Sequence, residues 1–320
     1  MNTPAIEVDD LVRTFGDVRA VDGISFTARP GQVLGLLGPN GSGKTTTVRM
    51  LATLLAPTGG RAAVLGHDVV SDAPAVRRRI GLTGQYAAVD DALTGRDNLV
   101  LIGRLLDLPA RVARATAADL IDRFGLAEAA GRRVRTYSGG MRRRLDLAAS
   151  LVGDPEVLFL DEPTTGLDPR HRNEVWDTVR RLAADGVTVL LTTQYLEEAD
   201  QLAHDLVVLD RGRVIAEGTA AGLKARIGGR LLHVRPALPA DAPRVAAVVA
   251  AETGSEPSTA PSGEVSASAA DPRALRRTED RLTADGVAIA EIGLRLPSLD
   301  DVFLTLTGHA VAAAPTGGTS

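Results

Sequence analysis

A glycine-rich segment of the chain carries residue types that can bind a run of phosphates. Glycine, lysine and threonine follow the spacing G-x-x-x-x-G-K-[ST], directly after the apolar run 33–37. Glycines let the backbone approach an anion closely, and the N–H groups that open the following helix face the phosphates. The lysine places a charge on the β- and γ-phosphates, and the threonine offers a hydroxyl to Mg²⁺. The spacing therefore predicts a nucleotide-binding loop at Gly38-Pro39-Asn40-Gly41-Ser42-Gly43-Lys44-Thr45-Thr46.

A second segment supplies the carboxylates that phosphate chemistry requires. Four apolar residues at 157–160 are followed by Asp161 and Glu162, which is typical of a buried strand ending in two acids. In open α/β sheets, ligands bind at the carboxyl ends of the strands. We expect Asp161 to hold Mg²⁺ directly or through water, and Glu162 to accept a proton from the attacking water or to orient it. Lys44 completes this catalytic set.

The elements that must position these residues alternate along the chain. Apolar strands separated by helical segments predict an α/β fold with a largely parallel core sheet. A short antiparallel sheet is expected over 6–26, before the glycine-rich segment, and a helical subdomain at about 86–152. The expected core strands are 33–37, 157–161, 187–192 and 205–210, and the expected helices between them are 43–55, 169–184 and 195–203.

The sequence changes character around residue 228. We predict an ATP-binding domain over 1–228, a small α+β accessory domain of ferredoxin-like character over 229–310, and a disordered tail over 311–320. Within the second domain, 252–262 is rich in small and polar residues and is also expected to be disordered.

Composition limits the alternatives. At 320 residues, with 44% hydrophobic and 24% charged residues, the chain has the make-up of a soluble globular protein. No apolar run approaches the ~20 residues that span a bilayer. The absence of cysteine excludes disulfides and thiolate metal sites, and the net charge of −4 argues against a nucleic-acid partner. The arginine triplets 77–79 and 142–144 are interpreted as solvated helix faces or local anion-facing patches.

Taken together, these motifs resemble the ATP-binding cassette (ABC) family, over about residues 5–225. The run Ser138-Gly139-Gly140 is similar to the family's signature sequence, and Asp168, in Gly166-Leu167-Asp168, to its D-loop. Phe15 stands where the family's adenine-stacking aromatic lies; its position and the scarcity of aromatic residues favour stacking, with a core aromatic as the alternative. Gln85 matches the glutamine between the ATP site and the membrane partner, a position also expected to contact Mg²⁺. The resemblance implies a P-loop NTPase fold of ABC type that binds ATP and Mg²⁺.

Two further runs, 191–200 and 298–308, look like those of the daunorubicin/doxorubicin-resistance ATPases of actinobacteria. That resemblance implies an ATP-hydrolysing subunit at the cytoplasmic face of the membrane, paired with a separate transmembrane permease that exports a hydrophobic drug. It also implies a homodimer formed on ATP binding, in which the loop of one chain and the signature of the other hold each nucleotide. Export of a lipid, a polysaccharide or another small molecule, and a weakly hydrolysing regulatory role, stay open as alternatives.

Two positions depart from the family pattern. Met141 stands in place of the usual glutamine after Ser-Gly-Gly, a change of little expected consequence. Gln194 stands where most ABC ATPases have histidine near the γ-phosphate, and we include it among the catalytic residues. A glutamine donates an N–H to a phosphate oxygen but carries neither charge nor transferable proton at neutral pH. We expect hydrolysis to persist, because Lys44, Thr45, Asp161 and Glu162 are all present.

Overall fold

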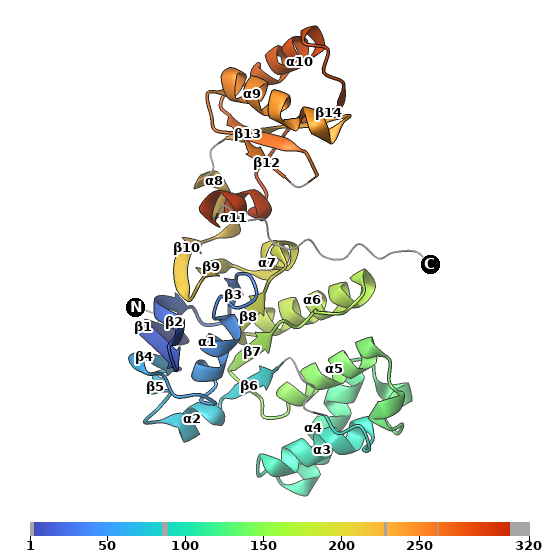
Figure 1. Ribbon diagram of the computed structural model, residues 1–320. Helices are drawn as coiled ribbons and strands as arrows, with labels where there is room; N and C mark the ends of the chain where they lie inside the picture. Colours follow the sequence, from blue (N-terminus) through green and yellow to red (C-terminus); the bar gives the residue numbers. More distant parts are fainter. Residues whose placement is uncertain (1–2, 85–88, 227–228, 261, 308–320) are drawn as a thin grey trace. The chain divides into compact units, whose positions relative to one another are not determined.

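The computed structural model describes residues 3–84, 89–226, 229–260 and 262–307, with backbone alone for 304–307. The chain divides between Glu217 and Gly218 into two compact units, shown in Figure 1.

The first unit is built on a six-stranded sheet in the order β10-β9-β3-β8-β7-β6. Neighbouring strands from β9 to β6 run parallel to one another. All residues of β3, β7 and β8 are buried, as expected for parallel strands covered on both faces. The strands are β3 (Val33–Leu37), β6 (Ile80–Thr83), β7 (Val157–Asp161), β8 (Thr188–Thr193), β9 (Asp205–Asp210) and β10 (Arg213–Gly218).

Helices between these strands pack against the sheet. The helices α1 (Lys44–Leu51), α6 (Pro169–Ala184) and α7 (Leu196–Leu202) each contact the sheet. This arrangement is the predicted α/β architecture with a parallel core. It places the carboxyl ends of β3, β7 and β8 side by side, because Leu37 pairs with Thr193 and Asp161 with Thr192.

A smaller antiparallel sheet has the order β2-β1-β4-β5, as the N-terminal alternation predicts. The first two strands form a hairpin in which Ile6 pairs with Ala28 and Phe15 with Val18. Phe15 is therefore held beside the hairpin turn. The elements of this region are β1 (Ile6–Phe15), β2 (Val18–Ala28), β4 (Gly59–Val64), β5 (His67–Asp68) and the short helix α2 (Ala73–Arg77).

The helical region consists of α3 (Gly95–Leu105), α4 (Ala110–Arg123) and α5 (Gly139–Ser150). Thr94 caps α3 by accepting a hydrogen bond from the Asp97 N–H at 3.1 Å, which satisfies one of the free donors of the first turn. The apolar side chains of α3 differ in how far they are buried. Leu99 is fully buried in the core, whereas Leu105 is 73% exposed. Nowhere in the described chain is a helix both long and apolar enough to cross a membrane.

The second unit has a β-α-β-β-α-β order of ferredoxin-like type. Its antiparallel sheet has the order β12-β13-β11-β14, and the helices α9 and α10 contribute to one apolar core with it. Its main elements are β11 (Arg230–Pro236), α9 (Ala242–Thr253), β12 (Ser258–Thr259), β13 (Val265–Ala269), α10 (Ala274–Ala284), β14 (Ile289–Arg295) and α11 (Leu299–Thr307).

The second unit differs from expectation in two places. The expectation that 252–262 is disordered is wrong for Ser258 and Thr259, because these residues pair with Ser266 and Val265 of β13. The unit also starts at Gly218 rather than after 228, because α8 (Ala220–Arg226) packs against α11. The strand β12 has only two residues and lies in a Pro- and Ser-rich segment, so the sequence shows no alternation of polar and apolar residues that would predict it.

Candidate functional site

The glycine-rich loop connects β3 to α1 and encloses the Lys44 side chain. Lys44 is 4% exposed, and its Nζ donates to the carbonyl oxygens of Gly38 at 2.8 Å and Pro39 at 3.1 Å. Gly43 has a φ of 103°, which non-glycine residues rarely adopt. A Cβ on Gly38 would lie 2.3 Å from the Leu209 carbonyl oxygen. The loop therefore requires glycine at these two positions.

Two acids face the Lys44 ammonium. Burial lowers the pKa of Lys44, while the carboxylates of Glu162 and Asp161 raise it. The Glu162 Oε1 lies 3.5 Å from the Lys44 Nζ. The Lys44 ammonium already faces the carboxylates of Glu162 and Asp161. It can also donate a charge-assisted hydrogen bond to a bound phosphate, which would be its third anionic partner.

Asp161, at the end of β7, lies beside the hydroxyl that starts α1. Its Oδ1 accepts from the Thr45 Oγ1 at 3.1 Å and from the Thr192 Oγ1 at 2.6 Å. Mg²⁺ prefers hard oxygen ligands and is usually bound by one or two protein groups together with substrate phosphates. The residues present fit this ion, because a threonine hydroxyl and a 4% exposed carboxylate already touch one another.

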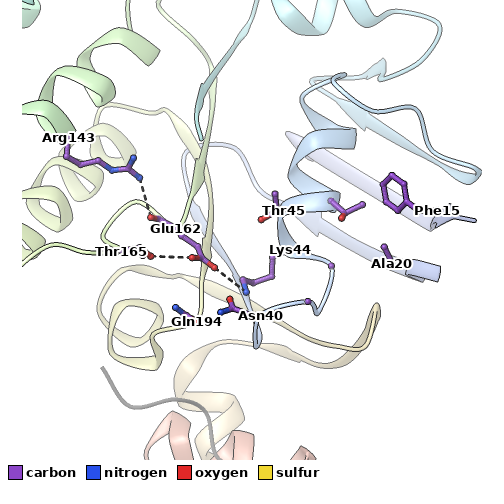
Figure 2. A pocket seen from close by; sticks show the side chains of 12 residues that line it. Phe15, Ala20, Asn40, Lys44, Thr45, Arg143, Glu162, Thr165 and Gln194 are labelled. Atoms are coloured by element: carbon purple, nitrogen blue, oxygen red, sulfur yellow. Dashed lines mark hydrogen bonds and ion pairs between the residues drawn. The ribbon is translucent and has the colours of Figure 1, made fainter. Parts of the chain in front are cut away.

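Glu162 follows Asp161 in an unusual backbone conformation, with a φ of 51°. Its N–H donates to the carbonyl oxygen of Thr192 at 3.1 Å and to the Thr192 Oγ1 at 3.0 Å. Its Oε2 accepts from the Thr165 Oγ1 at 3.3 Å. The carboxylate is thus directed towards Lys44 and the loop, as Figure 2 shows.

These groups line a cavity of about 890 Å³ (Figure 2). The cavity combines a cation, a carboxylate, hydroxyls, backbone N–H groups and an aromatic ring. This combination is suited to a nucleoside triphosphate. The predicted residues in its lining are Phe15, Asn40, Gly41, Gly43, Lys44, Thr45, Thr46, Glu162 and Gln194, and the other members are Ala20, Arg143 and Thr165. Gln85 lies outside the described residues.

Phe15 stands at the edge of this cavity, and its side chain is not part of the core. It is 46% exposed, and the Arg13 guanidinium lies 4.6 Å from the centre of its ring. An exposed ring on the wall of a phosphate site offers a surface on which a base can stack. The position therefore favours adenine stacking over the core interpretation.

We expect Phe15→Ala to raise the KM for ATP roughly tenfold and to leave kcat almost unchanged, because base stacking on an aromatic contributes ~1–3 kcal/mol. Steady-state phosphate release over a range of ATP concentrations measures both constants. Val18→Ala, on the same hairpin and 67% exposed, serves as the control and should not change KM. A fall in kcat at constant KM would contradict the stacking role.

The remaining predicted residues are not among those that line this cavity in the described chain. Ser138 caps α5 by accepting from the Met141 N–H at 3.2 Å, and Asp168 caps α6 by accepting from the His171 N–H at 3.1 Å. The His171 ring packs on Gly140, where a Cβ would lie 2.2 Å from its Cδ2. Ser138 and Gly139 are exposed. Helix α5 thus presents free N–H groups at a surface, where an anion from elsewhere can approach.

Sequence reasoning missed three polar residues of the site. Thr192 orients both Asp161 and Glu162, and it was passed over as one more residue of a buried strand. Thr165 lies in the run Pro163-Thr164-Thr165-Gly166, whose residue types are typical of a turn and give no sign of a site residue. Arg143 belongs to a triplet interpreted as solvated or anion-facing, yet its side chain is only 14% exposed. Asp146 lies at i,i+4 from Arg142 and at i,i+3 from Arg143, so helical spacing alone does not tell these two arginines apart.

Comparison with known proteins agrees with this geometry. Residues 21–165 match the family model described as "ABC transporter". The chain is 52% identical over 313 residues to the daunorubicin/doxorubicin resistance ATP-binding protein DrrA of Streptomyces peucetius, covering 96% of this chain and 93% of that protein. It is 48% identical to the doxorubicin resistance ATP-binding protein DrrA of Mycobacterium tuberculosis, covering 95% of this chain and 93% of that one.

Among solved structures, an ATP-binding subunit of an ABC transporter superimposes with a TM-score of 0.64. The two chains are 25% identical, and the match covers 71% of this chain and 94% of the other. The sequence likeness thus extends over nearly the whole chain, whereas this structural likeness covers about the length of the first unit.

Proposed function

Since this chain belongs to the ABC transporter family of ATP-binding proteins, among the daunorubicin/doxorubicin resistance members, we propose that it hydrolyses ATP to drive efflux of a hydrophobic drug through a separate membrane subunit. The observation that carries the proposal is the 52% identity over almost the whole chain to a drug-resistance ATP-binding protein. The cavity that holds Lys44, Thr45 and Glu162 together supports the ATPase step.

In this mechanism, the loop N–H groups and Lys44 bind the β- and γ-phosphates, and Phe15 stacks on the base. Thr45 and Asp161 would hold Mg²⁺, which would supply positive charge against the phosphates. Glu162 orients the attacking water and accepts its proton. Gln194 donates an N–H hydrogen bond to a phosphate oxygen. Its amide does not transfer a proton to that oxygen.

We further propose that two chains share each nucleotide. Ser138, Gly139, Gly140 and Asp168 are set apart from the cavity of their own chain, at the starts of α5 and α6. A second copy that approaches face to face offers these groups to the γ-phosphate. Closure around ATP and reopening after hydrolysis would then move the membrane subunit between its two states, at the cytoplasmic face of the membrane.

Two measurements test the proposed function. The purified chain with Mg²⁺ should release phosphate from ATP faster than its Glu162→Gln variant. Inverted vesicles that contain the chain and its separate membrane subunit should accumulate daunorubicin when ATP is added. Turnover equal to that of Glu162→Gln would contradict the ATPase, and ATP-dependent accumulation of a lipid or an oligosaccharide in place of the drug would redirect the transport assignment.

Gln194 leads to a prediction about pH. The glutamine side chain does not titrate, whereas a histidine with a pKa of about 6.5 changes charge between pH 6 and 8. We therefore expect the ratio of Gln194→His to wild-type turnover to change with pH and to show a step at about pH 6.5. Phosphate release measured in parallel for the two proteins provides this ratio. A ratio that is constant over the range would place the side chain away from the reacting phosphate.

A further inference from the structure

Arg143 differs from the two arginines beside it in what it contacts. Arg142 is 37% exposed and pairs with Asp91 at 2.9 Å. Arg144 donates to the Phe124 carbonyl oxygen at 3.2 Å within the helical region. Arg143 instead lines the nucleotide cavity, as Figure 2 shows. One position in the triplet is thus directed from α5 into the site.

The Arg143 guanidinium joins two segments of backbone through three carbonyl oxygens. Its Nε donates to the Pro163 carbonyl oxygen at 2.5 Å, and one terminal nitrogen donates to the Glu162 carbonyl oxygen at 3.3 Å. The other terminal nitrogen donates to the Gly84 carbonyl oxygen at 3.3 Å. A planar guanidinium with five donors can bridge several acceptors at once, which a lysine ammonium cannot do in the same fixed geometry.

Asp146 holds this guanidinium in place. It lies one turn further along α5, is 3% exposed, and its Oδ2 is 3.4 Å from the Arg143 nitrogen. Burial lowers the pKa of Arg143, while Asp146, Glu198 and Asp161 raise it. Because a guanidinium keeps its proton in proteins, Arg143 remains a cation in the site.

The backbone of Glu162, which Arg143 contacts, has an unfavourable conformation that must be held in place. A residue before proline is normally pushed to an extended φ, yet Glu162 precedes Pro163 with a φ of 51°. A non-glycine residue in this region costs ~1–3 kcal/mol and persists only where its surroundings hold it. Thr192 holds the N–H side of Glu162, and Arg143 holds its carbonyl side.

We propose that Arg143 is a positioning residue that fixes the backbone of Glu162 and ties it to α5, the helix that Ser138 caps. This inference rests on the proposed ATPase function. It makes one helix responsible for two tasks: its first residues face the nucleotide of the partner copy, and its fifth residue holds the water-activating carboxylate of its own chain. Removal of the guanidinium should therefore slow the chemical step more than it weakens nucleotide binding.

The test uses the full-length chain with ATP and Mg²⁺. Arg143→Met and Arg143→Lys should each lower kcat about 10²-fold, the cost of a misplacement of about 1 Å in a catalytic site, with KM and bound ATP per chain almost unchanged. Arg144→Lys is the matched control, on the same helix and with a carbonyl partner outside the site, and it should stay near wild type. Arg143→Met/Asp146→Leu also removes the buried carboxylate that faces Arg143, so that a second variant without this buried charge is available.

The outcomes separate this inference from the proposed function. A fall in kcat with ATP binding and thermal stability retained in the double variant supports the positioning role. A kcat within about twofold of wild type, or a loss of ATP binding in place of turnover, overturns it, because the positioning term is of the order of 10²-fold. Wild-type turnover equal to that of Glu162→Gln instead contradicts the proposed ATPase and leaves no rate for Arg143 to influence.

Discussion

Replacement of Glu162 by glutamine should lower ATP turnover about 10²- to 10⁴-fold, the usual contribution of a positioned general base. Glutamine has nearly the same size and can still accept from Thr165, which lies 3.3 Å from the present Oε2. It cannot take a proton from water, and it removes the charge that lies 3.5 Å from the Lys44 Nζ. The variant should therefore bind ATP at least as tightly as the wild type while failing to hydrolyse it.

Phosphate release and size-exclusion chromatography with ATP measure the two sides of this prediction. The variant should elute as a dimer with Mg²⁺ and ATP, because the nucleotide that holds the copies together is not consumed. Glu156→Gln is the matched control. Glu156 immediately precedes the same strand, is 54% exposed and pairs with Arg79 at 2.7 Å, far from the cavity lining. Equal turnover in the Glu162 variant and the wild type would remove this residue from the mechanism.

Ser138→Arg should abolish turnover and ATP-dependent pairing together. The substitution removes the cap that accepts from the Met141 N–H, and it places a long cation at the exposed start of α5. Loss of a serine cap alone costs about 1 kcal/mol of stability, so the fold should survive. Turnover should be lost because the arginine side chain blocks the start of α5, where the second copy binds. Phosphate release and chromatography with ATP again report both quantities.

A mixing experiment locates that effect in a shared site. Ser138→Arg and Lys44→Ala should each be inactive alone, since one lacks the signature and the other lacks the phosphate cation. A mixed dimer of the two has one site with both intact groups. With one blocked site per mixed dimer instead of two, the mixture should regain turnover that neither variant shows alone, up to about one quarter of wild type, the limit for random pairing through a symmetric interface. Turnover of Ser138→Arg equal to wild type, without any pairing on ATP, would contradict the shared site.

The parts of the fold with strong local signals were predictable. The buried strands 157–161 and 205–210 appear at the predicted limits, because long apolar runs bounded by polar residues leave little choice of register. The glycine-rich loop has its own fixed spacing. The strand at Ser258–Thr259 was not predictable, because two polar residues acquire strand geometry only through pairing with β13.

In the site, too, the residues that belong to short sequence motifs were predictable, and those that act from distant segments were not. Lys44, Thr45 and Glu162 belong to motifs whose order and type indicate phosphate chemistry, and the structure brings them into one cavity. Thr192 and Arg143 act on Glu162 from segments that lie 30 and 19 residues away along the chain. Their contribution depends on which strands are neighbours and which face of α5 points inwards. No motif encodes either property.

The hydrogen bond between Thr45 and Asp161 joins residues 116 positions apart in the chain. Contacts of such large sequence separation form late and slowly in parallel sheets, so a partly synthesised chain lacks a working pocket until β7 and β8 have docked. A ligand that recognises only the finished pocket stabilises it by mass action. The nucleotide that fuels this protein would thus also raise its free energy of unfolding, so that the fold should be sturdier in a cell rich in ATP than in a nucleotide-free buffer.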